Sequence, residues 1–176
     1  ENLSFGENLI ENGNFVDGTN WKQYENGSNV GNDLFDGTNT NTLDGSGSIK
    51  FTKGDGVHKL HSSKIKIQND KEYTIGFYMK SEGNPLPNLL FQATHYDKDE
   101  NYIKNDWHSH RWGNSKANTW EEVFIKIKAL PTTEYFILKI QNYDNVEGVD
   151  NNIWLDDFYI KLEQLKEDII PKESFT

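Results

Sequence analysis

The sequence predicts an all-β fold in which two antiparallel sheets pack as a β-sandwich. Segments in which apolar and polar residues alternate recur along the chain, as in strands that bury one face. Clusters of Gly, Asn, Asp and Pro separate these segments. No window shows the apolar stripe of a helix. About nine short strands at this spacing are typical of two packed antiparallel sheets.

Each predicted strand is identified by its own alternation. The clearest spans 72–80, where Tyr73, Ile75, Phe77 and Met79 lie on one face and polar residues lie on the other. The segment 122–129 alternates as cleanly. The other predicted strands are 89–96, 135–141 and 153–162, with one or two more within 56–67. Residues 97–101 predict a hairpin turn, and 27–48 is more loop than strand.

The composition limits the kind of partner. The chain has 176 residues, a formal net charge of -10 and a pI of about 4.9. This charge argues against nucleic acid and anionic membrane surfaces as partners, and it suits a neutral or cationic partner. No cysteine is present, so disulfides and thiolate chemistry are excluded. Aromatic residues make up 13% of the chain against 34% hydrophobic residues in total, which leaves rings available for a surface that binds sugars.

Two phrases near the ends of the chain carry a family resemblance. The first is Asn8-Leu9-Ile10-Glu11-Asn12-Gly13-Asn14-Phe15, followed by Trp21, and the second is Ile153-Trp154-Leu155-Asp156-Asp157-Phe158-Tyr159-Ile160. They resemble the opening motif and the closing strand of carbohydrate-binding modules of families 4, 9, 16 and 22. The resemblance implies a jelly-roll sandwich, like the galactose-binding domain, over residues 8–163. Residues 1–7 would be an extension and 164–176 a tail or linker.

The densest group of candidate ligand-binding residues is the segment 105–114, which shows no strand alternation and is predicted to be a loop. Trp107 or Trp112 would stack on a sugar ring, and His108, His110 or Arg111 would bond to hydroxyl groups. The alternative is a loop that folds its rings over the edge of the core. The pair His108-x-His110 is also compatible with a metal, since residues two apart on an extended chain share a face.

Polar strand faces supply further candidates. Amides and rings together suit sugar recognition, since amides both donate and accept hydrogen bonds. If these faces line one cleft, the residues are Tyr78, Gln92, Tyr96 and Gln141. The alternative is that the faces are simply solvated. Trp21 either lines the cleft or belongs to the core. Gln23 shares its face, which favours a polar side that faces the ligand, so both are candidate binding residues.

The resemblance also implies a structural calcium ion where the first and last strands meet. Calcium prefers six to eight oxygen ligands. Asn14 of the opening motif and Asp156 of the closing strand are the predicted ligands. The sequence departs from the family pattern at Val16, where a glutamate is expected.

The predicted function is non-catalytic binding of a polysaccharide or oligosaccharide, which tethers a larger extracellular enzyme or assembly to glycan. No motif marks a nucleophile or a pair of catalytic carboxylates. Two alternatives keep the fold. One is a module of a phage tail or baseplate that binds host cell-wall glycan, and the other is a purely structural sandwich that packs against other domains.

Overall fold

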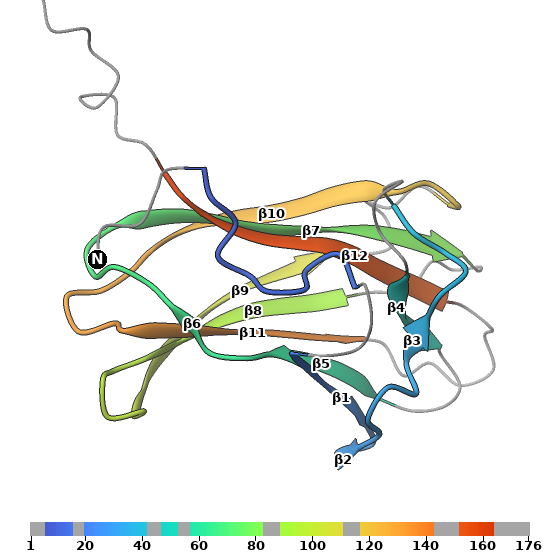
Figure 1. The fold of residues 1–176 in the computed structure, drawn as a ribbon, viewed down its shortest axis with the longest axis horizontal. Coiled ribbons are helices and arrows are strands. Elements are labelled where there is room, and N and C mark those ends of the chain that lie inside the picture. Colours follow the sequence, from blue (N-terminus) through green and yellow to red (C-terminus); the bar gives the residue numbers. More distant parts are fainter. Residues whose placement is uncertain are drawn as a thin grey trace, which may run out of the picture.

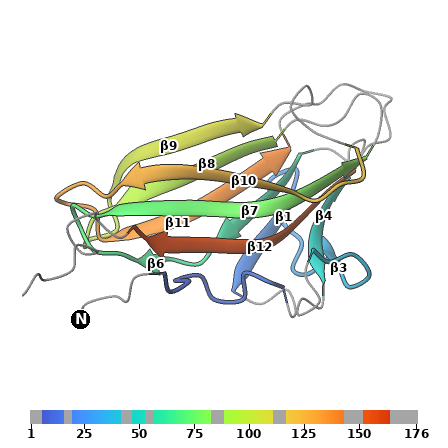
Figure 2. The ribbon, with the colours of Figure 1, turned by 90° about the horizontal axis from the view of Figure 1, so that it is seen from above.

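The computed structural model describes residues 6–15, 20–41, 47–52, 57–82, 89–110, 117–142 and 152–163. Within these ranges the chain forms two antiparallel sheets that face each other as two layers (Figures 1 and 2). The predicted all-β sandwich is therefore confirmed. The described residues contain no helix long and apolar enough to cross a membrane.

One layer is a seven-stranded sheet. It has an edge strand at each end, β2 and β9, and β6 pairs with the central strand β11. In spatial order its strands are β2 (Ser28–Asn29), β1 (Trp21–Glu25), β5 (His58–Ser62), β11 (Tyr135–Asn142), β8 (Leu89–Tyr96) and β9 (Tyr102–His110), with β6 (Ile65–Lys66) beside β11.

The other layer is a five-stranded sheet, and the closing strand of the chain lies at its centre. In spatial order its strands are β10 (Glu121–Lys128), β7 (Glu72–Glu82), β12 (Asn152–Leu162), β4 (Ser48–Thr52) and β3 (Phe35–Asp36). The apolar faces of both sheets point into the sandwich and form its core.

The strands predicted at 72–80, 89–96, 122–129, 135–141 and 153–162 are present as β7, β8, β10, β11 and β12, and 56–67 contains β5 and β6. The hairpin turn after β8 is confirmed, and the Asp97 carboxylate organises it by accepting hydrogen bonds from the backbone of Asp99 and Asn101. The loop predicted at 105–114 is wrong up to His110, because β9 extends to that residue. As an edge strand β9 carries polar side chains on both faces, so it lacks the apolar alternation of an inner strand.

The opening motif of the chain docks onto the closing strand. The Leu9 backbone N–H donates to the Ile160 carbonyl, and the Phe158 N–H donates to the Gly13 carbonyl, so the segment 6–15 runs along β12 (Figure 1). The Phe158 ring packs inward against Phe15, Trp21 and Phe77, with centroid distances of 5.7, 4.7 and 4.9 Å. This cluster joins both ends of the chain to one core.

Gly13 is required by this docking. A Cβ atom at Gly13 would lie 2.2 Å from the carbonyl oxygen of Phe158, which is a backbone atom that cannot move aside cheaply. We predict that Gly13→Ala lowers the free energy of unfolding by about 1–3 kcal/mol, the usual cost of overpacking. Chemical denaturation would measure this loss, and faster hydrogen exchange at the Phe158 amide would locate it. An unchanged midpoint would contradict the close approach.

Candidate functional site

A row of side chains crosses the outer face of the seven-stranded sheet. Cross-strand pairing places Lys22 opposite His61, His61 opposite Lys139, Lys139 opposite Gln92, and Gln92 opposite Trp107. Directly opposite residues of antiparallel strands point to the same face of the sheet. The row therefore spans β1, β5, β11, β8 and β9, a distance of about 19 Å at about 4.8 Å per strand.

A second row lies beside the first. Tyr24 is opposite Lys59, Lys59 is opposite Gln141, and Gln141 is opposite Leu90. The rows touch where the Tyr24 ring lies 4.9 Å from the His61 ring, measured between centroids. The same face thus displays rings, amides and amines side by side.

Trp107 is the most exposed large apolar side chain among the described residues, with 66% of its surface accessible. Its neighbour Asp106 points to the inner side of β9, where its Oδ2 lies 2.7 Å from Nε2 of the buried His95. This contact fixes which face of the edge strand points inward. Because successive side chains point to opposite faces, Trp107 then faces outward.

Burial lowers the pKa of His95, and the adjacent Asp106 opposes this shift without reversing it. The imidazole is therefore neutral near pH 7, and it donates from Nε2 to Asp106 while Nδ1 accepts from the Thr133 hydroxyl at 3.0 Å. The polar groups under β9 are satisfied, so they hold the strand without competing for a ligand.

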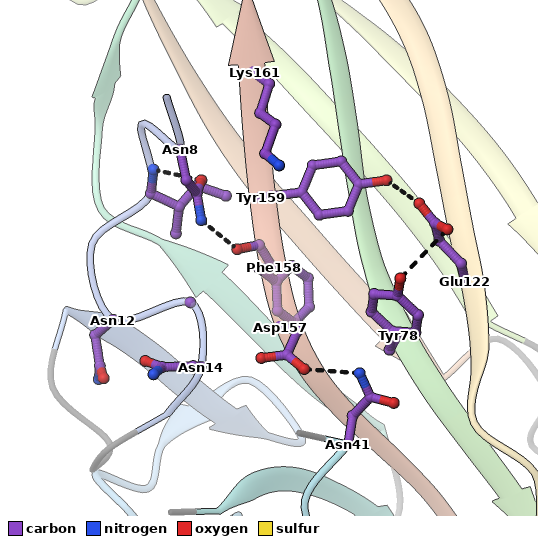
Figure 3. Close-up of a pocket in the computed structure, with 12 residues that line it drawn as sticks. Asn8, Asn12, Asn14, Asn41, Tyr78, Glu122, Asp157, Phe158, Tyr159 and Lys161 are labelled. Atoms are coloured by element: carbon purple, nitrogen blue, oxygen red, sulfur yellow. Dashed lines mark hydrogen bonds between the residues drawn. The ribbon is translucent and has the colours of Figure 1, made fainter. Parts of the chain in front are cut away.

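The opposite face of the sandwich carries a hollow of about 600 Å³ between the segment 6–15, β12 and β10. Figure 3 shows Tyr78 and Tyr159 directed toward Glu122, and both hydroxyls donate to its carboxylate. Burial raises the pKa of both tyrosines, and Glu122 raises it further. Asp157 lies at the other side of the hollow and accepts a hydrogen bond from the Asn41 side chain at 2.8 Å (Figure 3).

Comparison with protein families identifies the domain. Residues 7–146 match the family model of a carbohydrate binding domain, CBM_4_9. The match covers well over half of the chain. The chain belongs to this family. Its members are non-catalytic binding modules, as the sequence predicted. No curated protein sequence matches the chain.

Solved structures of low sequence identity share the fold of this carbohydrate-binding domain. A tailspike protein 4 domain of bacteriophage CBA120 is 14% identical with a TM-score of 0.67, over 89% of this chain and 21% of that chain. The CBM22-1–GH10 modules of a Clostridium thermocellum xylanase, solved with xylohexaose, are 14% identical with a TM-score of 0.60, over 92% of this chain and 29% of that one. The module TmCBM61, solved with β-1,4-galactotriose, is 13% identical with a TM-score of 0.54, over 90% of this chain and 100% of that one. This chain thus spans under a third of the first two proteins.

Four of the predicted binding residues lie together on the outer face of the seven-stranded sheet. They are Gln92, Tyr96, Trp107 and Gln141. His108 instead pairs with Phe91, whose side chain is buried in the core, so it points to the inner side of β9. The backbone of His110 belongs to β9, but its side chain lies outside the described residues, as do Arg111 and Trp112.

Trp21 and Gln23 were predicted as alternatives for a cleft or the core, and the structure places both in the core. The Trp21 indole packs against Phe158 and donates a hydrogen bond to the Asn12 carbonyl at 3.1 Å. Gln23 is fully buried, and its Oε1 accepts from the Leu34 backbone at 2.9 Å. Neither side chain has a face for a sugar.

Tyr78 does not share a cleft with Gln92 and Tyr96, because it lies on the outer face of the other sheet. Alternation had identified its face correctly, but it carries no information about which sheet a strand joins. The residues that sequence reasoning missed are Lys22, Tyr24, Lys59 and His61. The sequence shows that they occupy polar positions of short strands, but it does not show the cross-strand register that brings them together on one face.

Asp156 and Asp157 are explained by a bulge in β12. The pairing of β12 with β7 shifts between Asp156 and Tyr159, and Asp157 has a positive φ of 51°. The bulge lets both carboxylates reach Thr40 and Asn41. Asp156 Oδ2 accepts from the Thr40 hydroxyl at 3.0 Å and from the Asn41 N–H at 2.8 Å, and Oδ1 accepts from the Asp157 N–H.

These contacts bear on the predicted calcium. Asp156 is buried and surrounded by O–H and N–H donors, whereas calcium needs a shell of oxygen ligands. Asn14 lines the outer hollow with Asp157 rather than joining Asp156 (Figure 3). The described residues contain no cluster of three or more His, Asp or Glu side chains that could hold a metal. They do not by themselves fit a calcium ion, and calcium binding by Asn14 and Asp156 stays a prediction.

Asp156 can be tested through the pH dependence of stability. Burial raises its pKa from 3.8 to about 6, with Asp157 adding to the rise and the hydrogen bonds opposing it. The folded state therefore holds the proton more tightly than the unfolded chain. The stability from this group is complete below about pH 4 and falls as pH rises through about 6. We predict that Asp156→Ala costs about 2–4 kcal/mol through the donors it orphans, with a larger loss near pH 4 than near pH 8.

Denaturation of both proteins at the two pH values, with and without chelator, measures this difference. A bound calcium ion would lower the pKa of Asp156 and reverse the sign, since cations favour the ionised carboxylate. A larger loss near pH 8, together with a fall in melting temperature on chelation, would establish the calcium site and contradict the hydrogen-bonded state.

Proposed function

We propose that this carbohydrate-binding domain holds a polysaccharide against the outer face of the seven-stranded sheet. The observation that carries the proposal is the exposed Trp107 ring in cross-strand register with Gln92 and Lys139. An exposed ring can stack on the C–H face of a pyranose, and amide and amine groups can bond to its hydroxyls.

The shape of the face supports binding along a chain. Together the two rows cross five strands. Among the described residues, no backbone hydrogen bond holds another segment over them. Tyr24 stands near one end of the surface and Trp107 near the other. An extended polysaccharide could lie across the strands with several sugars in contact. Each stacked ring contributes on the order of 1 kcal/mol, so binding in the micromolar to millimolar range is expected.

The biological role proposed is tethering. Domains of this family typically belong to extracellular carbohydrate-active enzymes, so we place the domain outside the cell, where it would hold a larger protein on its glycan. The fold shared with a phage tailspike domain makes attachment to a host surface glycan the second candidate. The domains that flank this one in the full protein distinguish the two roles.

We predict that Trp107→Ala weakens binding to the preferred polysaccharide by up to about tenfold, since a stacked ring contributes about 1.5 kcal/mol at the upper end. The matched control is Phe124→Ala, which removes a ring that is 53% exposed on the five-stranded sheet. Affinity electrophoresis against a panel of plant and bacterial glycans would measure both variants, with melting temperature as the folding check. Equal losses for both variants would count against this face as the binding site, and no binding of the unmodified domain to any glycan would favour a purely structural sandwich.

A further inference from the structure

The outer face of the seven-stranded sheet is cationic although the chain is acidic. Lys22, Lys59 and Lys139 surround His61, two of them as its direct cross-strand partners. The formal net charge of the whole chain is -10. Yet the described residues whose side chains occupy this face include no aspartate or glutamate. They are Lys22, Tyr24, Asn29, Lys59, His61, Lys66, Leu90, Gln92, Thr94, Tyr96, Tyr102, Asn105, Trp107, Tyr135, Ile137, Lys139 and Gln141.

These lysines are not explained by structural needs. Lysine often protects the edge of a sheet from pairing with another chain. Lys59 and Lys139 lie on β5 and β11, which are inner strands with a partner on each side. Among the described residues, no carboxylate lies within ion-pair distance of Lys22, Lys59 or Lys139. Like charges gathered on one face repel each other, so their placement calls for a compensating anion.

The rest of the face is consistent with a ligand rather than with a counter-ion alone. Lys139 Nζ donates to the Tyr96 hydroxyl at 3.2 Å, which holds the amine at the sheet surface. Trp107 and Tyr24 flank the lysines with rings, and Gln92 and Gln141 add amides. Burial, together with the charges of Lys139, Lys59 and Lys22, lowers the pKa of His61 from 6.5 to about 4, so the imidazole between them is neutral near pH 7. His61 can therefore bond to a hydroxyl without adding repulsion.

We propose that the glycan bound on this face is anionic, with carboxylate or phosphate groups that contact Lys22, Lys59 and Lys139 while Trp107 and Tyr24 stack on its sugar rings. This inference rests on the proposed function and narrows its ligand class. It departs from the neutral or cationic partner that net charge predicts. Carboxylate and phosphate oxygens both form charge-assisted hydrogen bonds with lysine, so the two sources share one recognition chemistry.

The test compares anionic glycans with neutral ones, and one anionic and neutral pair differs only in its charged group. Calorimetric titration would use polygalacturonate, its carboxyl-reduced and therefore neutral counterpart, a wall teichoic acid as the phosphate-bearing arm, and neutral xylan. We expect binding to polygalacturonate, to the teichoic acid or to both, with loss of binding to the reduced polymer. Affinity for the anionic ligand should fall between about 0.05 and 0.5 M salt, because screening weakens exposed charge pairs. The arm that binds more tightly identifies the anionic group.

Variants locate the effect on this face. Lys59→Gln and Lys139→Gln should each weaken binding of the anionic glycan about two- to fivefold, and the variant with all three lysines replaced should lose the salt dependence. Lys126→Gln on β10 is the matched control, because it removes an exposed lysine from the other sheet and should change nothing.

Two outcomes would overturn the inference, and they are distinguishable from failure of the proposed function. Equal binding of neutral and anionic polymers, abolished by Trp107→Ala, would leave polysaccharide binding intact and remove the charge requirement. If Lys126→Gln lowered the affinity for the anionic glycan as much as Lys139→Gln, the effect would come from the overall charge of the domain and not from a site on this face. Failure to bind all four glycans and the wider panel would count against the proposed function itself.

Discussion

The structure depends on the closure of the sandwich by its last strand. β12 enters the middle of the five-stranded sheet, and its Phe158 ring packs against Phe15, Trp21 and Phe77. Hydrogen bonds join Leu9 and Gly13 to this strand across about 150 residues of sequence. Closing so long a loop costs conformational entropy, and the burial of four large rings offsets it. The opening motif and β12 therefore contribute to one shared core.

This closure also determines which residues reach the solvent on the opposite sheet. Trp21 is drawn inward by Phe158, so strand alternation turns Lys22 and Tyr24 outward on β1. At the other edge of that sheet, the buried contact between His95 and Asp106 turns Trp107 outward in the same way. The two ends of the candidate binding face are therefore oriented from the inside, by groups that never touch a ligand. A change in either internal contact would rotate the strand and disperse the row.

The sequence predicted the inner strands well and the site only in part, for one physical reason. Alternation reports which residues of a single strand share a face, and β7, β8, β10, β11 and β12 were identified on that basis. It does not report which strands are neighbours, so Tyr78 was grouped with Gln92 although they lie on opposite faces. The edge strand β9 was missed because solvent covers much of it. A tryptophan can pack in a core or stack on a sugar from the surface. Only the packing of the whole domain shows that Trp21 belongs to the core and that Trp107 is exposed.

Net charge does not describe the candidate binding face, because it averages over surfaces that do not act together. Glu122 and Asp157 line the hollow on the five-stranded sheet, while Lys22, Lys59 and Lys139 lie on the far side of the sandwich. Packed sheets are about 10 Å apart, and at physiological ionic strength charges are screened over about 8 Å. A ligand on the outer face of the seven-stranded sheet therefore responds mainly to the lysines beneath it. The acidic total governs solubility and long-range repulsion, and the local register of β1, β5 and β11 governs what the face can hold.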